Sequence, residues 1–170
     1  MIWFTADTHF DHKNILTLSN RPFDTIEDMN KSLIVNWNEK VTNSDTVYFL
    51  GDFAWKNPAP YIEQLNGEKL FVKGSHDSKI KAPYIRIIKP EGLKDEYGNH
   101  RRIILCHYSM RSWECSHYGS WHLFGHHHGM LEPYGLSFDV GVDCNKYYPF
   151  SLDDVVEKMK TLTPIVDYRK

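Results

Sequence analysis

Short apolar runs that end in polar residues constrain the fold of this chain more than any other feature. Seven runs have the length of a buried or half-buried strand, and they lie at 2–6, 46–50, 70–72, 85–88, 102–106, 121–124 and 137–142. Five of them end in, or lead directly into, potential ligand residues: Asp7-Thr8-His9, Gly51-Asp52, Gly74-Ser75-His76-Asp77, Cys106-His107 and Gly125-His126-His127-His128. The pattern predicts several strands whose carboxyl ends carry carboxylates, hydroxyls or imidazoles.

Helices are predicted between these runs. Thr25 followed by Asp28 is a helix-capping pattern, and apolar residues then recur at near-helical intervals as far as Val41. Further helices are expected at 59–65 and, with Ser151 as the cap, at 152–162. Strands separated by helices, followed by a strand-rich half with glycine turns, predict an α/β fold of two packed mixed sheets flanked by helices.

Composition sets the outer limits. The chain has 170 residues, 41% of them hydrophobic, which is enough for one core, and we expect a single domain over 1–170. The net charge of −2 gives no strong signal for nucleic-acid binding. Cys106, Cys115 and Cys144 lack CxxC spacing, so we expect reduced thiols and a cytoplasmic location. No membrane segment is expected, and the oligomeric state is left open.

The polar strand ends are expected to meet. In open α/β sheets the carboxyl ends of the strands gather on one edge, so these groups would line one crevice. Alternation along an extended segment would point Asp7 and His9 the same way, and likewise His126 and His128, so that each pair could grip one ion. Carboxylate and imidazole ligands suit Mn, Fe or Zn, and a carboxylate such as Asp52 can bridge two ions.

Simpler interpretations exist for each residue alone. Asp7 and Asp52 could cap helices, and His107 could be a hydrogen-bonded core histidine. The histidines at 126–128 could form a solvated turn. Three aromatic residues, Trp113, Tyr118 and Trp121, could be a base-stacking wall, although a core position is the better expectation. The conjunction of all the polar strand ends favours a metal site over these separate explanations.

The ordered pattern resembles a known superfamily. The series D-x-H at 7–9, G-D at 51–52, G-x-H-D at 74–77, a lone His107 and G-H-x-H at 125–128 is similar to the signature of the calcineurin-like metallophosphoesterases. The words "DTHFDHKNI", "NRPF", "GSWHLFGHHHG" and "VGVDCN" look like a small, cap-less subgroup from bacteria and phages. The resemblance implies a four-layer α/β/β/α sandwich of two mixed sheets flanked by helices.

The resemblance also implies roles for individual residues. Asp7, His9 and His128 would bind a first metal, Asp52 would bridge to a second, and His107 and His126 would bind that second metal. The superfamily completes the second site with an Asn, where this chain has Ser75. His76 would face the scissile phosphate, and Asp77 would orient its imidazole. The expected cofactors are two divalent ions, Mn²⁺ first, with Fe, Ni or Zn as alternatives.

The implied activity is hydrolysis of a phosphate ester by a hydroxide that bridges the two metals. A small phosphodiester or nucleotide is the expected substrate, because neither a cap domain nor a long basic groove is evident. Three further residues, His12, Arg21 and Arg111, are candidates for gripping the phosphate, since arginine matches phosphate geometry well. The alternatives are a weakened or non-catalytic module that binds a phosphoester or a partner, and a nuclease.

Overall fold

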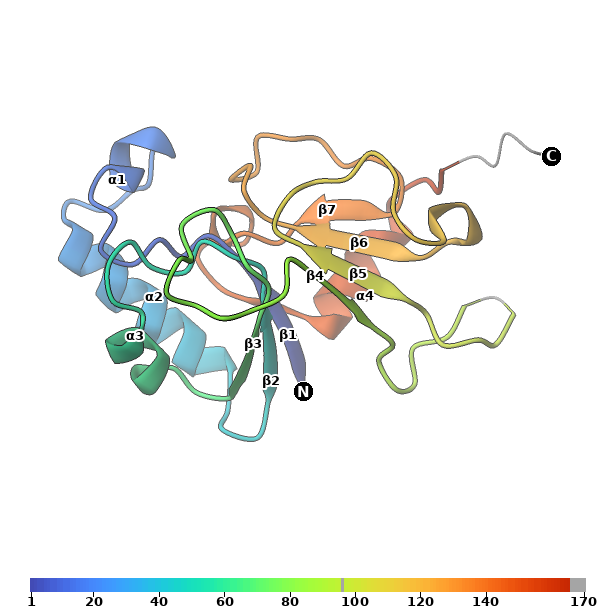
Figure 1. Ribbon diagram of the computed structural model, residues 1–170, viewed down its shortest axis with the longest axis horizontal. Coiled ribbons are helices and arrows are strands. Elements are labelled where there is room, and N and C mark those ends of the chain that lie inside the picture. Colours follow the sequence, from blue (N-terminus) through green and yellow to red (C-terminus); the bar gives the residue numbers. More distant parts are fainter. Residues whose placement is uncertain (96, 166–170) are drawn as a thin grey trace.

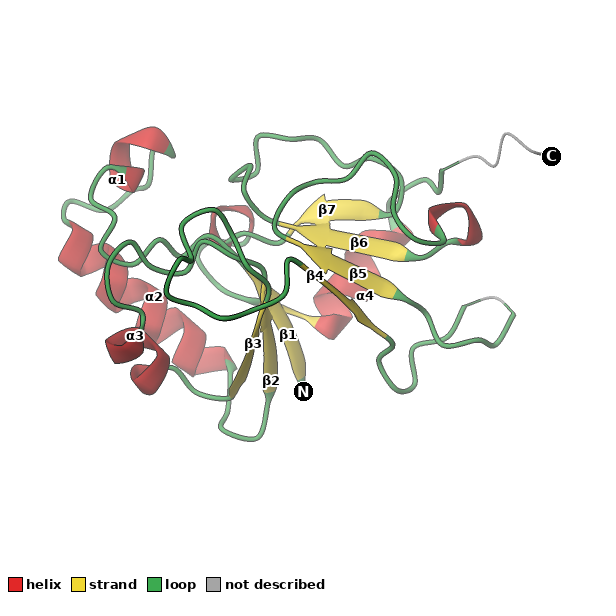
Figure 2. Cartoon of the chain, viewed as in Figure 1, coloured by secondary structure: helices red, strands yellow, loops and turns green. Residues whose placement is uncertain are grey.

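The computed structural model describes residues 1–95 and 97–165 and contains two four-stranded sheets (Figures 1 and 2). The first sheet has the order β3-β2-β1-β8, with β1 (Ile2–Thr5), β2 (Thr46–Phe49), β3 (Glu68–Phe71) and β8 (Phe150–Ser151). Strands β1, β2 and β3 are parallel, and β8 pairs antiparallel with β1. Three carboxyl ends of this sheet therefore lie on one edge.

The second sheet repeats this arrangement. Its order is β4-β5-β6-β7, with β4 (Ile85–Ile88), β5 (Ile103–Cys106), β6 (Trp121–Phe124) and β7 (Ser137–Asp139). Strands β5, β6 and β7 are parallel and β4 is an antiparallel edge. A parallel bridge between Ala6 and Gly141 joins the segments that follow β1 and β7. The carboxyl ends of the parallel strands in the two sheets, where the polar residues lie, are therefore close to one another.

Helices flank the sheets. The α-helices are α1 (Ile15–Leu18), α2 (Ile26–Lys40), α3 (Ala59–Gln64) and α4 (Leu152–Lys160), and the 3-10 helices are η1 (Ser116–Tyr118) and η2 (Val142–Cys144). Figure 1 places α2 and α3 beside the first sheet, and α4, which follows β8 directly, contacts β8 and β1 of the same sheet. Thr25 caps α2 through the Asp28 amide, and Ser151 forms a capping box with Asp154. Among the described helices, none has the length and apolar character needed to cross a membrane.

Two apolar clusters hold the layers together. Trp3, Leu33 and Phe49 belong to the cluster that joins the first sheet to α2. Phe4 and Leu123 belong to the second cluster, which fills the space between the sheets and includes side chains of α4. Successive residues of β1 thus point into different clusters, as expected for a strand buried on both faces.

The predicted fold class is confirmed: the chain is an α/β protein with two mixed sheets flanked by helices. The prediction for 137–142 was too long, because β7 stops at Asp139 and the chain enters η2 at Val142. Helix α1 and strand β8 were not predicted. Both are too short to show a periodic pattern, and β8 exists through its pairing with β1.

Candidate metal centre

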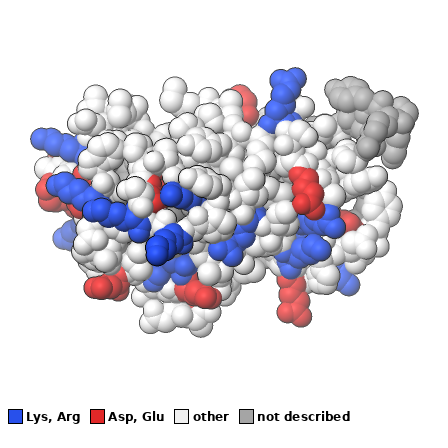
Figure 3. Space-filling view, viewed as in Figure 1, with Lys and Arg blue, Asp and Glu red and all other residues white. Residues whose placement is uncertain are grey.

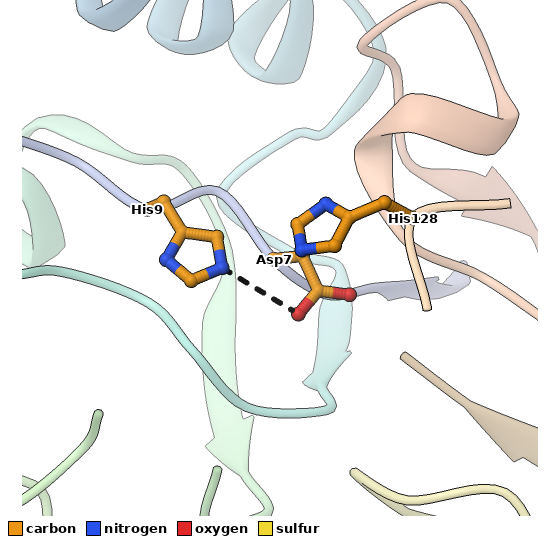
Figure 4. Close-up of side chains that lie close together, drawn as sticks. All are labelled: Asp7, His9 and His128. Carbon is orange, nitrogen blue, oxygen red and sulfur yellow. Dashed lines mark ion pairs between the residues drawn. The ribbon is translucent and has the colours of Figure 1, made fainter. Parts of the chain in front are cut away.

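Two groups of potential ligands lie at the carboxyl edge of the sheets. Asp7, His9 and His128 form one group, and Asp52, His107 and His126 form the other, with the ligand atoms of each group within 4.8 Å of one another. The loops after β1, β2, β5 and β6 supply them. Figure 4 shows the rings of His9 and His128 directed toward the Asp7 carboxylate. The structure thus brings together six residues that the sequence placed at four separate strand ends.

Asp52 lies where the two groups meet. Its Oδ2 atom is 3.3 Å from His107 Nε2 in its own group and 3.8 Å from His9 Nε2 in the other. The His76 Nε2 atom is also 3.8 Å from this oxygen. Asp7 Oδ1 lies 3.9 Å from both His9 Nε2 and His107 Nδ1. One carboxylate oxygen therefore faces ligand atoms of both groups, as a bridging ligand would.

Several of these ligand atoms are buried without a hydrogen-bond partner. They include Asp7 Oδ1, His9 Nε2 and His107 Nε2, all shielded from solvent. Leaving a buried polar atom unpaired costs about 1–3 kcal/mol, and native structures rarely gather such atoms without a reason. These carboxylate and imidazole atoms lie close together, are shielded from solvent and lack hydrogen-bond partners. Such a set is suited to bind a divalent transition metal.

Neighbouring groups orient the imidazoles. His107 Nδ1 donates to the Leu50 carbonyl (2.8 Å), and His128 Nδ1 donates to Asp143 Oδ2 (2.7 Å). Each bond fixes the tautomer in which Nε2 keeps its lone pair, which is the form that binds a metal. The sequence interpretation did not assign Asp143, although it lies in the quoted word "VGVDCN".

Arg21 supports this arrangement from behind and does not face the open side of the site. The buried guanidinium forms two bonds to Asp143 (2.9 and 2.7 Å) and also donates to the carbonyl oxygens of Asp7 (2.6 Å) and Thr8 (3.0 Å). The prediction that Arg21 grips the phosphate is therefore wrong: its donors are already used. It holds the Asp7 backbone and, through Asp143, the His128 ring in place.

The backbone at the site is unusual. Positive φ angles in the left-handed region occur at five of the six grouped residues: Asp7 (60°), His9 (50°), Asp52 (59°), His126 (72°) and His128 (51°). This conformation costs a non-glycine residue on the order of 1 kcal/mol or more. Such strain concentrates at functional sites, where the surrounding fold imposes it.

These angles correct the alternation argument. Asp7 and His9 do not point the same way because the segment is extended; they converge through two left-handed residues. His126 and His128 do not share an ion site either, since His128 lies with Asp7 and His126 with Asp52. The division that the family resemblance implied matches the two observed groups. Periodicity alone gave the wrong pairing because the histidines follow the strand rather than belonging to it.

Close backbone packing brings the loops after β2 and β3 together. A Cβ atom at Gly51, whose φ is +95°, would lie 2.7 Å from the Gly74 backbone and 2.7 Å from His107 Nδ1. Only glycine fits at this contact. The two glycines therefore set how closely Asp52 approaches the segment that carries Ser75 and His76.

Burial and neighbouring charges shift the pKa values of the grouped residues. Burial raises the pKa of Asp7 to about 7, and His128 and His107 offset only part of that rise. Burial lowers the pKa of His9 to about 2, so this imidazole is neutral, as a ligand must be. Burial favours a higher pKa for Asp52, but the adjacent His107 imidazole and the His76 backbone amide hold it below its ordinary value. Burial favours a lower pKa for His107, but the Asp52 and Asp7 carboxylates raise it above its ordinary value.

Ser75 and Asp77 both contact the Asp52 segment. The Ser75 hydroxyl donates to the two Asp52 carboxylate oxygens (3.2 and 2.9 Å), so it lies beside the bridging position. Asp77 accepts hydrogen bonds from the backbone amides of Asp52, Phe53 and Gly74 (2.8–2.9 Å). The prediction that Asp77 orients the His76 imidazole is wrong, because both of its oxygens hold the backbone instead.

His76 and His12 lie next to the ligand groups but belong to neither. The His76 side chain is 38% exposed, and its backbone amide donates to Asp52 Oδ1 (2.9 Å). His12 is buried, and its ring lies 5.3 Å from that of His9 and 4.2 Å from that of Trp55, measured between centroids. Its Nδ1 atom has no partner. A phosphate contact by His12 stays a prediction.

The remaining candidates lie outside the two groups. Arg111 is exposed and lines a hollow of about 200 Å³ with Phe124 and Tyr134, so a phosphate contact by Arg111 also stays a prediction. Trp113 and Trp121 are buried, as the core interpretation expected, whereas Tyr118 is exposed. The three cysteines are free thiols, and none belongs to either ligand group.

Comparisons with known proteins give a family and a fold. No protein-family model matches the chain. The protein MJ1445 of Methanocaldococcus jannaschii, described as uncharacterized, is 38% identical, and the alignment covers 98% of this chain and 97% of that protein. The crystal structure of AQ665 from Aquifex aeolicus, described as a protein of unknown function, has a TM-score of 0.69 at 23% identity and covers 93% of this chain and 98% of that chain.

A predicted phosphoesterase from Streptococcus pneumoniae is a more distant match. It is 19% identical and has a TM-score of 0.44, with 82% of this chain and 71% of that chain covered, and this likeness is too slight to support a function. The similarity to AQ665 concerns the fold alone. The similarity to MJ1445 spans both proteins almost completely, and the chain therefore belongs to the same family as MJ1445.

Proposed function

We propose that this protein hydrolyses a phosphate ester with two divalent metal ions, Mn²⁺ being the first candidate. One observation carries the proposal: two three-residue ligand groups meet at Asp52, and three of their ligand atoms are buried without a partner. The sequence resemblance to the calcineurin-like metallophosphoesterases supports the same conclusion independently. We propose a small phosphodiester or nucleotide as the substrate.

Asp7, His9 and His128 would hold one ion, and His107 and His126 the other, with Asp52 shared. Bound ions of this kind supply Lewis acidity, since they polarise a phosphoryl oxygen and make a water molecule more acidic. The grouped residues carry two carboxylates and four imidazoles, so two divalent ions would leave the centre positive. A positive centre at the edge of the sheets attracts an anionic phosphate ester.

His76 is suited to act on the substrate. Its side chain is partly exposed, and its Nε2 atom lies 3.8 Å from Asp52 Oδ2, next to the grouped ligands yet outside both groups. An imidazole in this place can donate a proton to the leaving oxygen or stabilise charge on the phosphate. The Asp52 oxygen that accepts from the His76 amide keeps the residue close to the centre.

Ser75 is the observation that favours a second candidate, a weakened or non-catalytic module that binds a phosphoester or a partner. Its hydroxyl points to the Asp52 carboxylate and ends short of where an Asn amide would reach. The complete pair of ligand groups and the accessible His76 favour catalysis over this alternative.

The test combines metal content with activity. The protein is purified without chelator, loaded with Mn²⁺ and analysed for bound metal, and turnover is measured with bis-p-nitrophenyl phosphate, p-nitrophenyl phosphate and single-stranded DNA. We expect up to two ions per chain and metal-dependent hydrolysis of the phosphodiester. Bound metal without turnover would favour the binding module, and cleavage of DNA alone would favour a nuclease. The absence of bound Mn, Fe, Ni or Zn at saturation would contradict the proposal.

A further inference from the structure

One tryptophan differs from the others in exposure. Trp55 is 50% exposed, whereas the other tryptophans, Trp3, Trp37, Trp113 and Trp121, are 2–7% exposed and belong to the protein interior. A large aromatic side chain contributes to stability mainly when it is buried. Half of the Trp55 surface therefore contributes little to the stability of the fold.

His12 covers one face of this indole. The two rings are 4.2 Å apart between centroids and only 5° from parallel, which is a close stack. Because His12 covers one face and half of the residue is exposed, the exposed surface is assigned to the opposite face and the edges of the indole. His76 lies nearby, 5.1 Å from Trp55 and 5.9 Å from His12 between centroids, to the side of the stacked pair.

Backbone hydrogen bonds fix the segments that carry the stacked pair. The Trp55 amide donates to the Phe10 carbonyl (2.8 Å), and the His12 amide donates to the His9 carbonyl (3.0 Å). Phe10 and His12 are buried, so the side of the pair that faces the protein is fixed by packing. A flat surface that is already ordered binds another flat group with little loss of conformational entropy.

This surface borders the metal centre. Ring centroids link His12 to His9 (5.3 Å), a residue of the first ligand group, and Trp55 to His76 (5.1 Å). The exposed side chains of Lys56 and Lys79 line a small depression with His76. Lysine and arginine side chains also form a row across the middle of the face drawn in Figure 3. An aromatic group attached to a phosphate could thus contact the indole and the centre together.

We propose that the open face of Trp55 stacks on the nucleobase of a nucleotide-type phosphoester while its phosphate lies at the metal centre. The inference rests on the proposed function and names its substrate class. Every base has a flat π face, so stacking of this kind tolerates different bases. Trp55 is then a substrate-binding residue, and His12 positions it by covering its other face.

The test measures binding separately from turnover. Isothermal titration calorimetry in Mg²⁺ compares adenosine monophosphate with glycerol phosphate, which lacks an aromatic group, for the native protein, Trp55→Phe and Trp55→Leu. We expect Trp55→Leu to weaken the binding of adenosine monophosphate by about 5- to 150-fold and Trp55→Phe to weaken it less. The binding of glycerol phosphate should be the same in all three proteins. Tyr97→Leu, which removes a 78% exposed tyrosine between β4 and β5, is the control and should change the binding of neither ligand.

The outcomes separate the two proposals. The stacking inference would be overturned if Trp55→Leu lost the same affinity for both ligands. It would also be overturned if the native protein bound adenosine monophosphate no more tightly than glycerol phosphate. Neither result would affect the proposed hydrolysis. A Trp55-dependent preference for adenosine monophosphate in a protein that hydrolyses no phosphoester would support stacking and overturn the proposed hydrolase. Unfolding curves of the variants verify that each retains the native fold.

Discussion

The two ends of strand β2 use the same residue type in opposite ways. Asp45 precedes the strand, and its carboxylate accepts hydrogen bonds from the chain's amino group, the Trp3 indole and both the amide and the hydroxyl of Thr42. The amino group, followed by the Thr42 amide, holds the pKa of Asp45 well below its ordinary value. The Asp45 carboxylate at the amino end of the strand is therefore paired through both oxygens and stabilises the fold.

The carboxyl end of the sheet is not fully paired. Asp52 follows β2 in a left-handed conformation, and the adjacent Asp7 keeps a buried oxygen without a partner and a pKa of about 7. Groups held in strained, unpaired positions weaken the metal-free fold and create binding capacity. Asp45, before β2, therefore stabilises the fold, whereas Asp52, after the same strand, belongs to a candidate metal site.

Replacing the two aspartates gives the largest contrast. Asp52→Asn removes the charge that the two ligand groups share. We expect a loss of phosphodiesterase activity greater than about 100-fold, together with lower metal content. Even the loss of a group that only supports a metal ligand typically lowers metal affinity or activity by about 10–100-fold. Asp45→Asn, at the other end of β2, should lower thermal stability and keep the bound metal. Metal analysis and turnover measure both. Full activity in Asp52→Asn would show that the site is misplaced.

His76→Ala should separate chemistry from metal binding. We expect the variant to retain its metal and its rate of hydrolysis to fall by a factor of about 10²–10⁴. The loss should be larger for substrates with poor leaving groups, because these need a proton to depart. The side chain contacts the edge of the Asp52 carboxylate but belongs to neither ligand group. His100→Ala, at an exposed histidine before β5, is the matched control. Release of metal from His76→Ala would assign the residue to the centre instead.

The sequence predicted the fold because strand-length apolar runs and capping residues are local signals. Thr25 and Ser151 cap helices where their side chains indicated, and the seven runs correspond to seven strands. Strand β8 escaped prediction because two residues carry no periodicity and the strand depends on β1 as its partner. Short elements that exist only through tertiary pairing leave little trace in a single sequence.

The site was predicted in part. Residue types and their order identified the six ligand residues, since strand ends converge on one edge, but their division into two groups came from the family resemblance. The roles of Arg21 and Asp77 could not be predicted, because both depend on backbone atoms of distant segments: Arg21 binds carbonyls after β1, and Asp77 binds amides after β2. Side-chain contacts to the backbone leave no mark in residue spacing, so a buried arginine and an exposed one look alike in sequence.

Asp7→Asn should strengthen the metal-free fold while destroying the site. Because the folded-state pKa is raised, the native Asp7 reduces stability as pH rises from about 4 to 7, and the amide removes this effect, by up to about 4 kcal/mol at pH 8. Asp45→Asn should behave oppositely: its folded-state pKa is lowered, so the variant is less stable at neutral pH and the difference disappears as the pH falls below the ordinary aspartate value.

Denaturant unfolding of chelator-treated protein at pH 5 and pH 8 measures the Asp7→Asn difference, and a further measurement below about pH 4 tests whether the Asp45→Asn difference shrinks. The gap between Asp7→Asn and the native protein should widen with pH, whereas metal-loaded native protein should recover the lost stability and Asp7→Asn should not. A variant that is equally destabilised at both pH values would mean that Asp7 is a structural carboxylate like Asp45.

The smallest expected effect concerns Ser75. Its hydroxyl donates to both Asp52 oxygens and therefore lies beside the second ligand group, but an Asn side chain would extend one atom further and offer a neutral carbonyl oxygen. We expect Ser75→Asn to lower the Mn²⁺ concentration for half-maximal activity by roughly 10-fold, the lower end of the range for groups that support a metal, with little change in stability. Ser78→Asn, an exposed position of the same turn, controls for the substitution itself. If rate curves against free Mn²⁺ coincide for native protein and Ser75→Asn, the hydroxyl already supports the second ion as well as an amide would, and the carboxyl edge needs no seventh side-chain ligand.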